Sequence, residues 1–205
     1  TKKALLFPGQ GSQYPGLGEK TLGISPLAEE TYNIANDILE YNIKDISINS
    51  SKEEISDTKY AQPLIFIYSI IAYYALKDKN YIFDMVSGHS LGEISALVAS
   101  ESISVEDALR IIKVRAEKMQ EAGQKKPGKM LALVNPDKEQ IEKICSIDSI
   151  VVANINSPTQ IVVSGSEQDI DKAIELSKKL NIRKAIKLNV SGAFHSPLMK
   201  DVTDD

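Results

Sequence analysis

The sequence predicts an α/β fold in which a small domain is inserted into a larger one. Residues 3–7 have the pattern of a buried strand that enters a glycine-rich turn, and residues 85–87 that of a short strand followed by a helix. Residues 129–189 have a different rhythm, because strands and helices alternate there in the order βαββαβ. That order is typical of a ferredoxin-like unit, so we expect this stretch to form a separate small domain.

Four helices are expected in the larger domain besides its two strands. Apolar residues recur with helical spacing in four segments, at 26–40, 60–76, 91–99 and 104–122. The longest apolar run, at 64–76, is interrupted by Ser69 and is too short to span a bilayer. We therefore interpret it as part of a core helix.

The small domain has four predicted strands and two predicted helices. The strands are expected at 130–134, 150–155, 160–164 and 184–188, and the helices at 137–144 and 167–180. The segment 123–128 has the composition of a linker into this domain. We expect a larger domain of residues 1–124 and 190–205 and a small domain of residues 125–189. The chain stops in a polar run that closes no element, which indicates a truncated C-terminus.

Composition excludes several classes of protein. A net charge of -4 over 205 residues argues against binding to nucleic acid or to an anionic membrane surface. The N-terminal apolar run is too short for a secretory signal, and the single Cys145 excludes an internal disulfide and suits a reducing cytosol. The two histidines lack the spacing of metal ligands, so no metal site is expected. We expect a cytoplasmic monomer.

The charges are divided unevenly along the chain. Residues 123–188 carry a net charge of +3, and the rest of the chain carries -7. An acidic protein partner could therefore be steered to the small domain. Scattered, solvated surface charge explains the same count, so both interpretations stay open.

The run GHSLG at 88–92 fits the pattern G-x-S-x-G, in which a serine lies on a sharp turn between a strand and a helix. The glycines leave room for close chain packing, and Ser90 is held out from the sheet as a candidate nucleophile. The following helix points its N–H groups toward that hydroxyl, so the N–H of Leu91 is a natural donor to an oxyanion. The alternative is a tight turn whose serine only caps the helix.

A second oxyanion donor is expected from the glycine-rich turn at 9–11. Turns that follow parallel strands gather at the carboxyl ends of those strands, so a backbone N–H of this turn could reach the same site. The pattern of a phosphate-binding loop is absent here, and a plain turn is the alternative.

A serine hydroxyl needs a base to take its proton, and the chain offers two histidines. His89 directly precedes Ser90, and neighbouring side chains on a strand point to opposite faces, so a structural hydrogen-bonding role suits His89 better. His195 remains as the candidate general base, with a surface histidine as the alternative. No acidic residue stands out as the group that orients the base, although Asp201, Asp204 and Asp205 follow it.

Arg115 lies at an unusual place on its predicted helix. The apolar stripe of this helix consists of Val105, Ala108, Leu109, Ile112, Ala116 and Met119. Arg115 flanks that stripe instead of lying on the opposite, charged side. A guanidinium near a core needs an anion, and its planar fork matches a carboxylate, so a substrate carboxylate is one candidate. A snorkelling arginine or an internal salt bridge is the alternative.

Five motifs in order, running almost from end to end of the chain, resemble one known family. They are FPGQGSQ at 7–13, GHSLGE at 88–93, Arg115 in its helix, ANINSPTQ at 153–160 and SGAFHS at 191–196. Together they resemble the malonyl-CoA:acyl-carrier-protein transacylases of fatty-acid synthesis and the related acyltransferase domains of polyketide synthases.

The resemblance implies a role for each matched residue. Ser90 would carry the malonyl group, His195 would be the general base, and the backbone N–H groups of Gln10 and Leu91 would form the oxyanion hole. Arg115 would clamp the free carboxylate of the malonyl group.

The remaining matched residues would complete the substrate site. Phe194 would crowd branched acyl groups, and Asn154 and Asn156 would lie near the pantetheine arm, with His89 grouped among the substrate-binding residues. The fold of the family, an α/β-hydrolase-like domain with a ferredoxin-like insert, agrees with the order of elements given above. Members of the family run well past residue 205, and the resemblance implies that the missing segment supplies the group that orients His195.

We therefore expect an enzyme that moves malonyl from malonyl-CoA to the phosphopantetheine thiol of acyl carrier protein through a malonyl-Ser90 intermediate. CoA would leave, and no permanently bound cofactor is expected. One alternative is a serine esterase or thioesterase of the α/β-hydrolase class, which needs an acidic triad member. Another is a truncated module that binds carrier protein without turnover.

Overall fold

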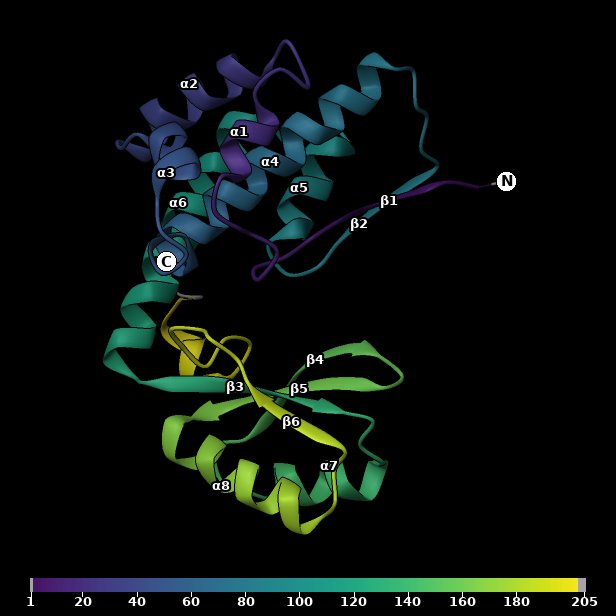
Figure 1. Ribbon diagram of the computed structural model, residues 1–205, viewed down its shortest axis with the longest axis vertical. Coiled ribbons are helices and arrows are strands. Elements are labelled where there is room, and N and C mark those ends of the chain that lie inside the picture. Colours follow the sequence, from purple (N-terminus) through teal and green to yellow (C-terminus); the bar gives the residue numbers. More distant parts are fainter. Residues whose placement is uncertain (1, 203–205) are drawn as a thin grey trace. The chain divides into compact units, whose positions relative to one another are not determined.

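The computed structural model describes residues 2–202, and the chain divides into two compact units that meet between Glu117 and Lys118 (Figure 1). The predicted division assigned the segment from 190 onward to the larger domain. In the structure this segment packs within the second unit, because Phe194 and Met199 belong to the same hydrophobic cluster as Met130.

The first unit is mainly helical. Its helices are α1 (Leu17–Thr21), α2 (Ala28–Leu39), α3 (Ile43–Asn49), the short 3-10 helix η1 (Glu54–Ser56), α4 (Thr58–Asp78), α5 (Gly92–Ala99) and the start of α6 (Val105–Lys125). The predicted helices of this unit are all present. The sequence did not indicate α1, α3 or η1, because segments this short contain too few turns for an apolar period to stand out.

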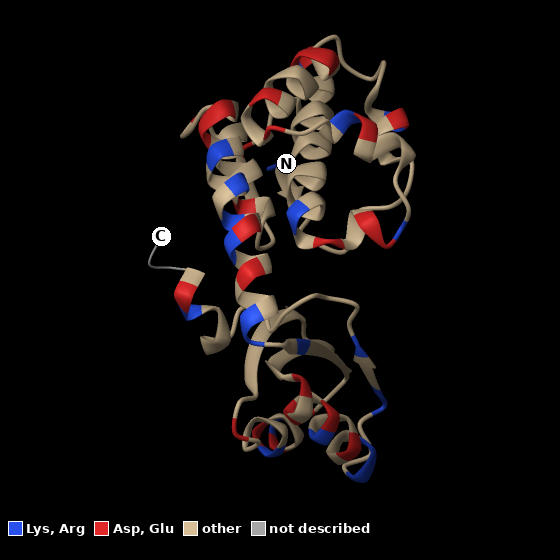
Figure 2. Cartoon of the chain, turned by 90° about the vertical axis from the view of Figure 1, so that its left-hand side faces the viewer, with Lys and Arg blue, Asp and Glu red and all other residues tan. Residues whose placement is uncertain are grey.

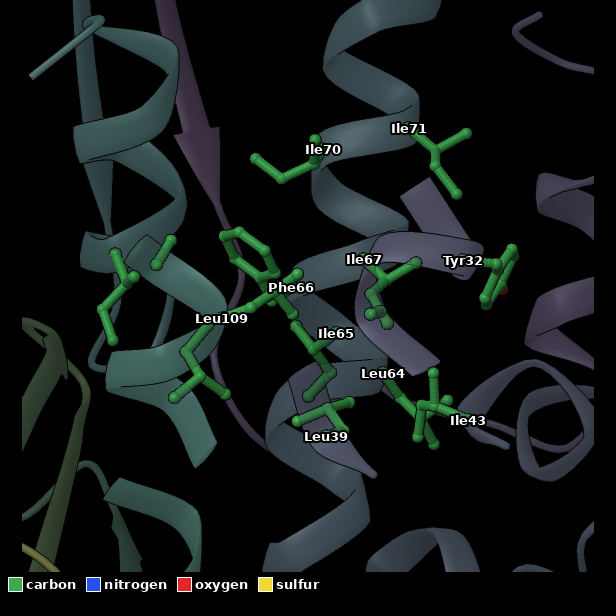
Figure 3. Packing of buried hydrophobic residues seen from close by; sticks show 14 of the residues in the cluster. Tyr32, Leu39, Ile43, Leu64, Ile65, Phe66, Ile67, Ile70, Ile71 and Leu109 are labelled. Carbon is green, nitrogen blue, oxygen red and sulfur yellow. The ribbon is translucent and has the colours of Figure 1, made fainter. Parts of the chain in front are cut away.

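The core of the first unit surrounds α4. Tyr32, Phe66 and Leu109 come from three different helices and are buried in one cluster around it (Figure 3). The side chains of α4 are buried on all sides from Ala61 to Ile67, which is the pattern of a helix inside a protein. The predicted core helix is therefore confirmed.

The strands β1 (Ala4–Phe7) and β2 (Met85–Gly88) pair in parallel. Phe7 is buried, but Leu6 on the opposite face is 71% exposed. The prediction that β1 is a buried strand is therefore wrong for one of its faces. The reason is that α5 packs on one side of this two-stranded sheet, so alternate side chains differ in their burial.

The second unit contains a four-stranded antiparallel sheet. Its elements are β3 (Gly128–Val134), α7 (Lys138–Cys145), β4 (Val151–Ser157), β5 (Gln160–Ser166), α8 (Glu167–Lys179), β6 (Lys184–Lys187) and the 3-10 helix η2 (Pro197–Val202). This is the predicted order of strands and helices, and the strands lie in the order β4-β5-β3-β6. The helix α6 continues to Lys125, so the linker is shorter than predicted.

The two faces of this sheet have different cover. Leu131 and Val163 point to the face that carries α7 and α8, where they join one hydrophobic cluster with Ile170 (Figure 1). Met130 and Val162 point to the other face and belong to a second cluster. The alternation follows from the two-residue period of a strand.

Both basic and acidic residues lie along the helices of the second unit (Figure 2). Lys143 pairs with Glu139 at 2.6 Å, and Lys178 pairs with Glu175 at 2.6 Å. These exposed pairs contribute little to stability, and they divide the positive charge into small local groups. Steering of an acidic partner to this unit stays a prediction.

Two kinds of feature are absent from residues 2–202. Within that range no helix has the length and apolar content that a membrane crossing requires. The same residues contain no group of three or more His, Cys, Asp or Glu side chains that could hold a metal ion.

The start of α8 generates a prediction about acid stability. Asp169 accepts hydrogen bonds from the Lys172 ammonium at 2.7 Å and from the Ser149 hydroxyl at 2.6 Å, and these contacts hold the pKa of its carboxyl below the usual value. Because this carboxyl has a lower pKa in the folded protein than in the unfolded chain, it stabilises the fold at pH values above its ordinary pKa of about 3.9. The contribution is lost as the pH falls through the pKa of the folded protein. Asp169→Asn should therefore lower the melting temperature at pH 7, and the difference from wild type should shrink below about pH 4.

The matched control is Glu175→Gln on the same helix, since Glu175 forms only an exposed ion pair. This variant should leave the melting temperature almost unchanged. A loss for Asp169→Asn that is the same at pH 3 and pH 7 would contradict the ionic explanation.

Candidate active site

The turn between β2 and α5 holds Ser90 in the conformation expected for a nucleophile elbow. Its φ angle is 52°, in the left-handed region that residues other than glycine rarely adopt. The turn is tied to the neighbouring strand, because the His89 N–H donates to the Phe7 carbonyl at 3.0 Å. A strained serine that follows a strand and precedes a helix is the geometry that the pattern G-x-S-x-G predicts.

Two glycines make this turn possible. A Cβ on Gly92 would lie 2.3 Å from the Phe7 carbonyl oxygen, and a Cβ on Gly88 would lie 1.9 Å from the carbonyl carbon of Gly92. Both distances are far shorter than a van der Waals contact. The start of α5 can therefore approach the ends of β1 and β2 only because Gly92 and Gly88 lack side chains.

The N-terminus of α5 points toward Ser90. The N–H of Gly92 donates to the His89 carbonyl at 2.9 Å, and the N–H of Glu93 donates to the Ser90 carbonyl at 3.0 Å. Leu91 comes before both donors, where the N–H groups of a helix have no preceding turn to bind. This position suits the predicted role of Leu91 as an oxyanion donor.

The glycine-rich turn after β1 lies against the same elbow. A Cβ on Gly9 would be 2.5 Å from the His89 carbonyl oxygen and 2.8 Å from the imidazole Nδ1 atom of the same residue. The following residue, Gln10, has its side-chain amide hydrogen-bonded to the Thr58 hydroxyl, with Nε2 at 2.9 Å from Oγ1. The structure therefore brings the turns that contain Gln10, His89 and Leu91 together.

The guanidinium of Arg115 reaches the serine. Its Nη2 donates to Ser90 Oγ at 3.0 Å, and its Nη1 donates to Gln62 Oε1. Burial lowers the pKa of Arg115 from its usual value, and the carboxylate of Glu93 offsets part of this effect. Arginine remains charged over the physiological range, so the site holds a half-buried positive charge beside the candidate nucleophile.

Sequence reasoning did not find two residues of this site. Thr58 and Gln62 lie one turn apart on α4, and both are 0% exposed. The available signal was the glutamine that precedes Pro63, just ahead of the apolar run at 64–76. A buried polar side chain at that point needs a partner, but the sequence does not say which one.

The other predicted site residues belong to the second unit, and they are described within it. His195 is exposed and has a φ angle of 57°, so its backbone is also in the left-handed region. Its loop is fastened on both sides, because the Ser196 hydroxyl donates to the Ala193 carbonyl at 2.6 Å and Lys129 Nζ donates to the Val190 carbonyl at 2.9 Å.

Phe194 is only 4% exposed and packs in the hydrophobic cluster with Val162 and Met199. Asn154 is half-buried on β4, opposite Val162 on β5. Asn156 is exposed near the end of the same strand, where its side chain donates to Gln160 Oε1 at 2.9 Å.

The acidic residues that follow His195 are only partly described. Asp201 pairs with Lys126 at 2.7 Å, and this pair lowers the pKa of its carboxyl. Asp204 and Asp205 lie outside the described residues.

The acyl transferase domain family matches residues 4–205, which is nearly the whole chain. The chain belongs to this family. A malonyl CoA-acyl carrier protein transacylase from Bacillus subtilis (strain 168) is 37% identical over 209 residues, which cover all of this chain and 66% of that protein. The predicted resemblance to the malonyl transacylases is thereby confirmed, and with it the enzyme class of the family, an acyltransferase.

Solved structures support the same α/β fold. The malonyl-CoA:ACP transacylase of Synechocystis sp. PCC 6803 is 34% identical with a TM-score of 0.90, over 100% of this chain and 67% of that one. A malonyl-transacylase in complex with a type II PKS acyl-carrier protein is 31% identical with a TM-score of 0.93, over 100% of this chain and 68% of that one. The chain therefore spans about two thirds of the length of these members of the acyl transferase domain family.

The packing of the elbow generates a second prediction. In Gly92→Ala the new methyl group would overlap the Phe7 carbonyl, so the free energy of unfolding should fall by about 1–3 kcal/mol and acylation of Ser90 should be lost. Urea unfolding and intact mass spectrometry after incubation with an acyl-CoA measure the two effects.

Gly23→Ala is the matched control, because a Cβ at Gly23 meets nothing within 4 Å and its φ is 84°. It should lose about 1–2 kcal/mol through backbone strain alone and keep its acylation. A Gly92→Ala protein that is acylated as fast as wild type would show that the close approach is not required.

Proposed function

We propose that this protein transfers a malonyl group from malonyl-CoA to the phosphopantetheine thiol of acyl carrier protein, as part of fatty-acid biosynthesis. The observation that carries the proposal is the hydrogen bond from Arg115 Nη2 to Ser90 Oγ at 3.0 Å. A malonyl ester of Ser90 has a free carboxylate close beyond its ester carbonyl, within reach of this guanidinium. A simple esterase or thioesterase has no use for a buried cation at that place.

The first step is the acylation of Ser90. The Ser90 hydroxyl gives its proton to the imidazole of His195, and Oγ forms a bond to the thioester carbon of malonyl-CoA. The N–H groups of Gln10 and Leu91 donate to the oxyanion of the tetrahedral intermediate. The carbon–sulfur bond then breaks, and the CoA sulfur takes the proton from His195.

The second step reverses the first on another thiol. The phosphopantetheine thiol of the carrier protein gives its proton to His195, and its sulfur attacks the ester carbon. The bond to Ser90 Oγ breaks, and Oγ recovers the proton. Arg115 holds the malonyl carboxylate in both steps, while Phe194, Asn154, Asn156 and His89 line the acyl and pantetheine path. Malonyl-CoA is a substrate, and the mechanism uses no permanently bound cofactor.

The proposed fold of the complete protein is an α/β-hydrolase-like domain with a ferredoxin-like insert. We place the larger domain at 1–124 and 190–205 and the small domain at 125–189, although Phe194 and Met199 of the last segment pack within the second unit of this structure. The order β4-β5-β3-β6 and the helices α7 and α8 on one face support the ferredoxin-like assignment. The exposed face of the parallel strands supports a larger domain in which that face is covered, because parallel sheets are normally covered on both faces.

The proposed partner, oligomeric state and location follow from the same chemistry. Acyl carrier protein is the macromolecular partner, and a monomer suffices because one chain supplies every group used above. The cytoplasm is the proposed location, where the partly buried thiol of Cys145 would stay reduced.

Intact mass spectrometry tests the proposal. After incubation with malonyl-CoA the protein should gain one malonyl group, and peptide analysis should locate it on Ser90. Ser90→Ala should gain nothing. Addition of the pantetheine-bearing carrier protein should then remove the group from the wild type.

The alternative functions give different results in the same experiment. Rapid release of CoA without an adduct would indicate a hydrolase. Absence of any reaction would indicate a module that binds carrier protein without turnover.

A further prediction concerns Arg115. Arg115→Ala removes the charge-assisted hydrogen bonds to the malonyl carboxylate, so kcat/KM for malonyl-CoA should fall about ten- to a hundred-fold more than that for acetyl-CoA. Arg115→Lys keeps the charge but loses the planar fork, and it should give an intermediate result. Equal losses for the two substrates would contradict the proposed clamp.

A further inference from the structure

One turn of α4 contacts both groups that the proposed reaction requires to be fixed. Thr58 contacts Gln10, and Gln62 contacts Arg115. Residues four apart on a helix lie on the same face, so the two contacts come from neighbouring side chains. Neither side chain touches solvent, since both residues are 0% exposed.

The contact with Gln62 fixes the orientation of the guanidinium. One terminal nitrogen of Arg115 donates to Gln62 Oε1, and the other donates to Ser90 Oγ. The amide oxygen is a neutral acceptor, so it holds the fork without cancelling its charge. A carboxylate at this place would form an ion pair with the guanidinium and compete with a bound anion.

The turn that carries Gln62 is itself held firmly. Pro63 has no N–H, which leaves the carbonyl of Lys59 without its usual donor in the helix. The hydroxyl of Tyr41 donates to this carbonyl at 3.2 Å. The Asp57 side chain caps the helix by accepting from the Lys59 N–H at 3.0 Å.

Below this turn the helix is anchored in the core of the first unit. Phe66 and Ile67 lie on the next turn of the helix after Gln62 (Figure 3), and both are 0% exposed. A side chain on such a turn has little freedom to move, which suits a group that must hold another group in place.

We propose that Gln62 is a positioning residue that holds the fork of Arg115 with one nitrogen directed at Ser90, and that it thereby sets the preference for an acyl group with a free carboxylate. The second part rests on the proposed function. Thr58 holds the turn that contains Gln10 in the same way. Because this turn supplies a proposed oxyanion donor, loss of the Thr58 contact should slow the transfer of every acyl group.

The test compares Gln62→Met with Thr58→Val in the complete protein. Methionine keeps the approximate volume of glutamine but removes the amide acceptor, and valine does the same for the hydroxyl of threonine. In Gln62→Met the KM for malonyl-CoA should rise about ten-fold, while values for acetyl-CoA stay within about two-fold of wild type. In Thr58→Val the kcat for both substrates should fall by the same factor.

A second measurement does not depend on activity. In protein labelled with 15N at arginine, rotation about the Nε–Cζ bond of Arg115 should be slow in wild type and in Thr58→Val, and fast in Gln62→Met. Rotation that stays slow in Gln62→Met would overturn the positioning role, whatever the activity. Fast rotation with an unchanged ratio of malonyl to acetyl transfer would overturn the link to selectivity.

Gln62→Glu covers the case in which Gln62→Met fails to fold. It keeps the acceptor and the volume, so rotation of the Arg115 fork should stay slow, but malonyl transfer should fall because the charge is paired. Malonyl transfer equal to wild type in Gln62→Glu would overturn the proposal. The wild-type protein distinguishes the proposed function from the positioning role. If rotation about the Nε–Cζ bond of Arg115 is slow but no malonyl adduct forms, the proposed function is contradicted while the positioning role remains supported.

Discussion

The close approach of α5 to the end of β1 is the contact on which the rest of the site depends. A side chain on Gly92 would overlap the Phe7 carbonyl, and a side chain on Gly88 would overlap the backbone of Gly92. Because the backbones meet directly, the chain must turn sharply between them, and Ser90 takes a positive φ. The same contact places the glycine-rich turn with Gln10 next to the elbow, so one packing constraint sets the positions of the proposed nucleophile and of both proposed oxyanion donors.

The electrostatics of the site follow from how the charge of Arg115 is supported. A half-buried guanidinium must satisfy its donors, and an acidic partner would satisfy them most strongly. Here the direct acceptors are an amide oxygen and a hydroxyl, while Glu93 acts only as a nearby charge. The hydrogen bonds of the guanidinium to Gln62 and Ser90 therefore go to neutral acceptors, which hold it in place without forming an ion pair with it. The proposed site for an anionic acyl group needs a cation that is held in this way.

The sequence predicted the parts of the site that have strong local signatures. The elbow around Ser90 has a fixed glycine spacing, and Arg115 stood out because it interrupts the regular separation of apolar and charged faces on its helix. Gln62 was missed, since a single polar residue at the edge of an apolar run does not reveal its partner. The order of elements in the second unit was predicted from periodicity, but the exposed face of β1 was not, because burial of a short strand depends on which helices cover it. The roles that were assigned to the site residues all stay predictions: Ser90, His195, Gln10, Leu91, Arg115, Phe194, Asn154, Asn156 and His89.

Because of Pro63, one hydrogen bond that supports α4 comes from a tyrosine hydroxyl, and the stability of the fold therefore depends on pH in the alkaline range. The Lys59 carbonyl depends on a phenol for its hydrogen bond, and a phenolate could not donate. Burial raises the pKa of Tyr41 above that of an exposed tyrosine, with a further contribution from Tyr60, so the folded protein holds this proton more tightly than an unfolded chain does. An unfolded chain would release it near pH 10. Alkali therefore favours unfolding before it breaks the bond in the native state, and the support beneath Gln62 persists for as long as the helix itself remains folded.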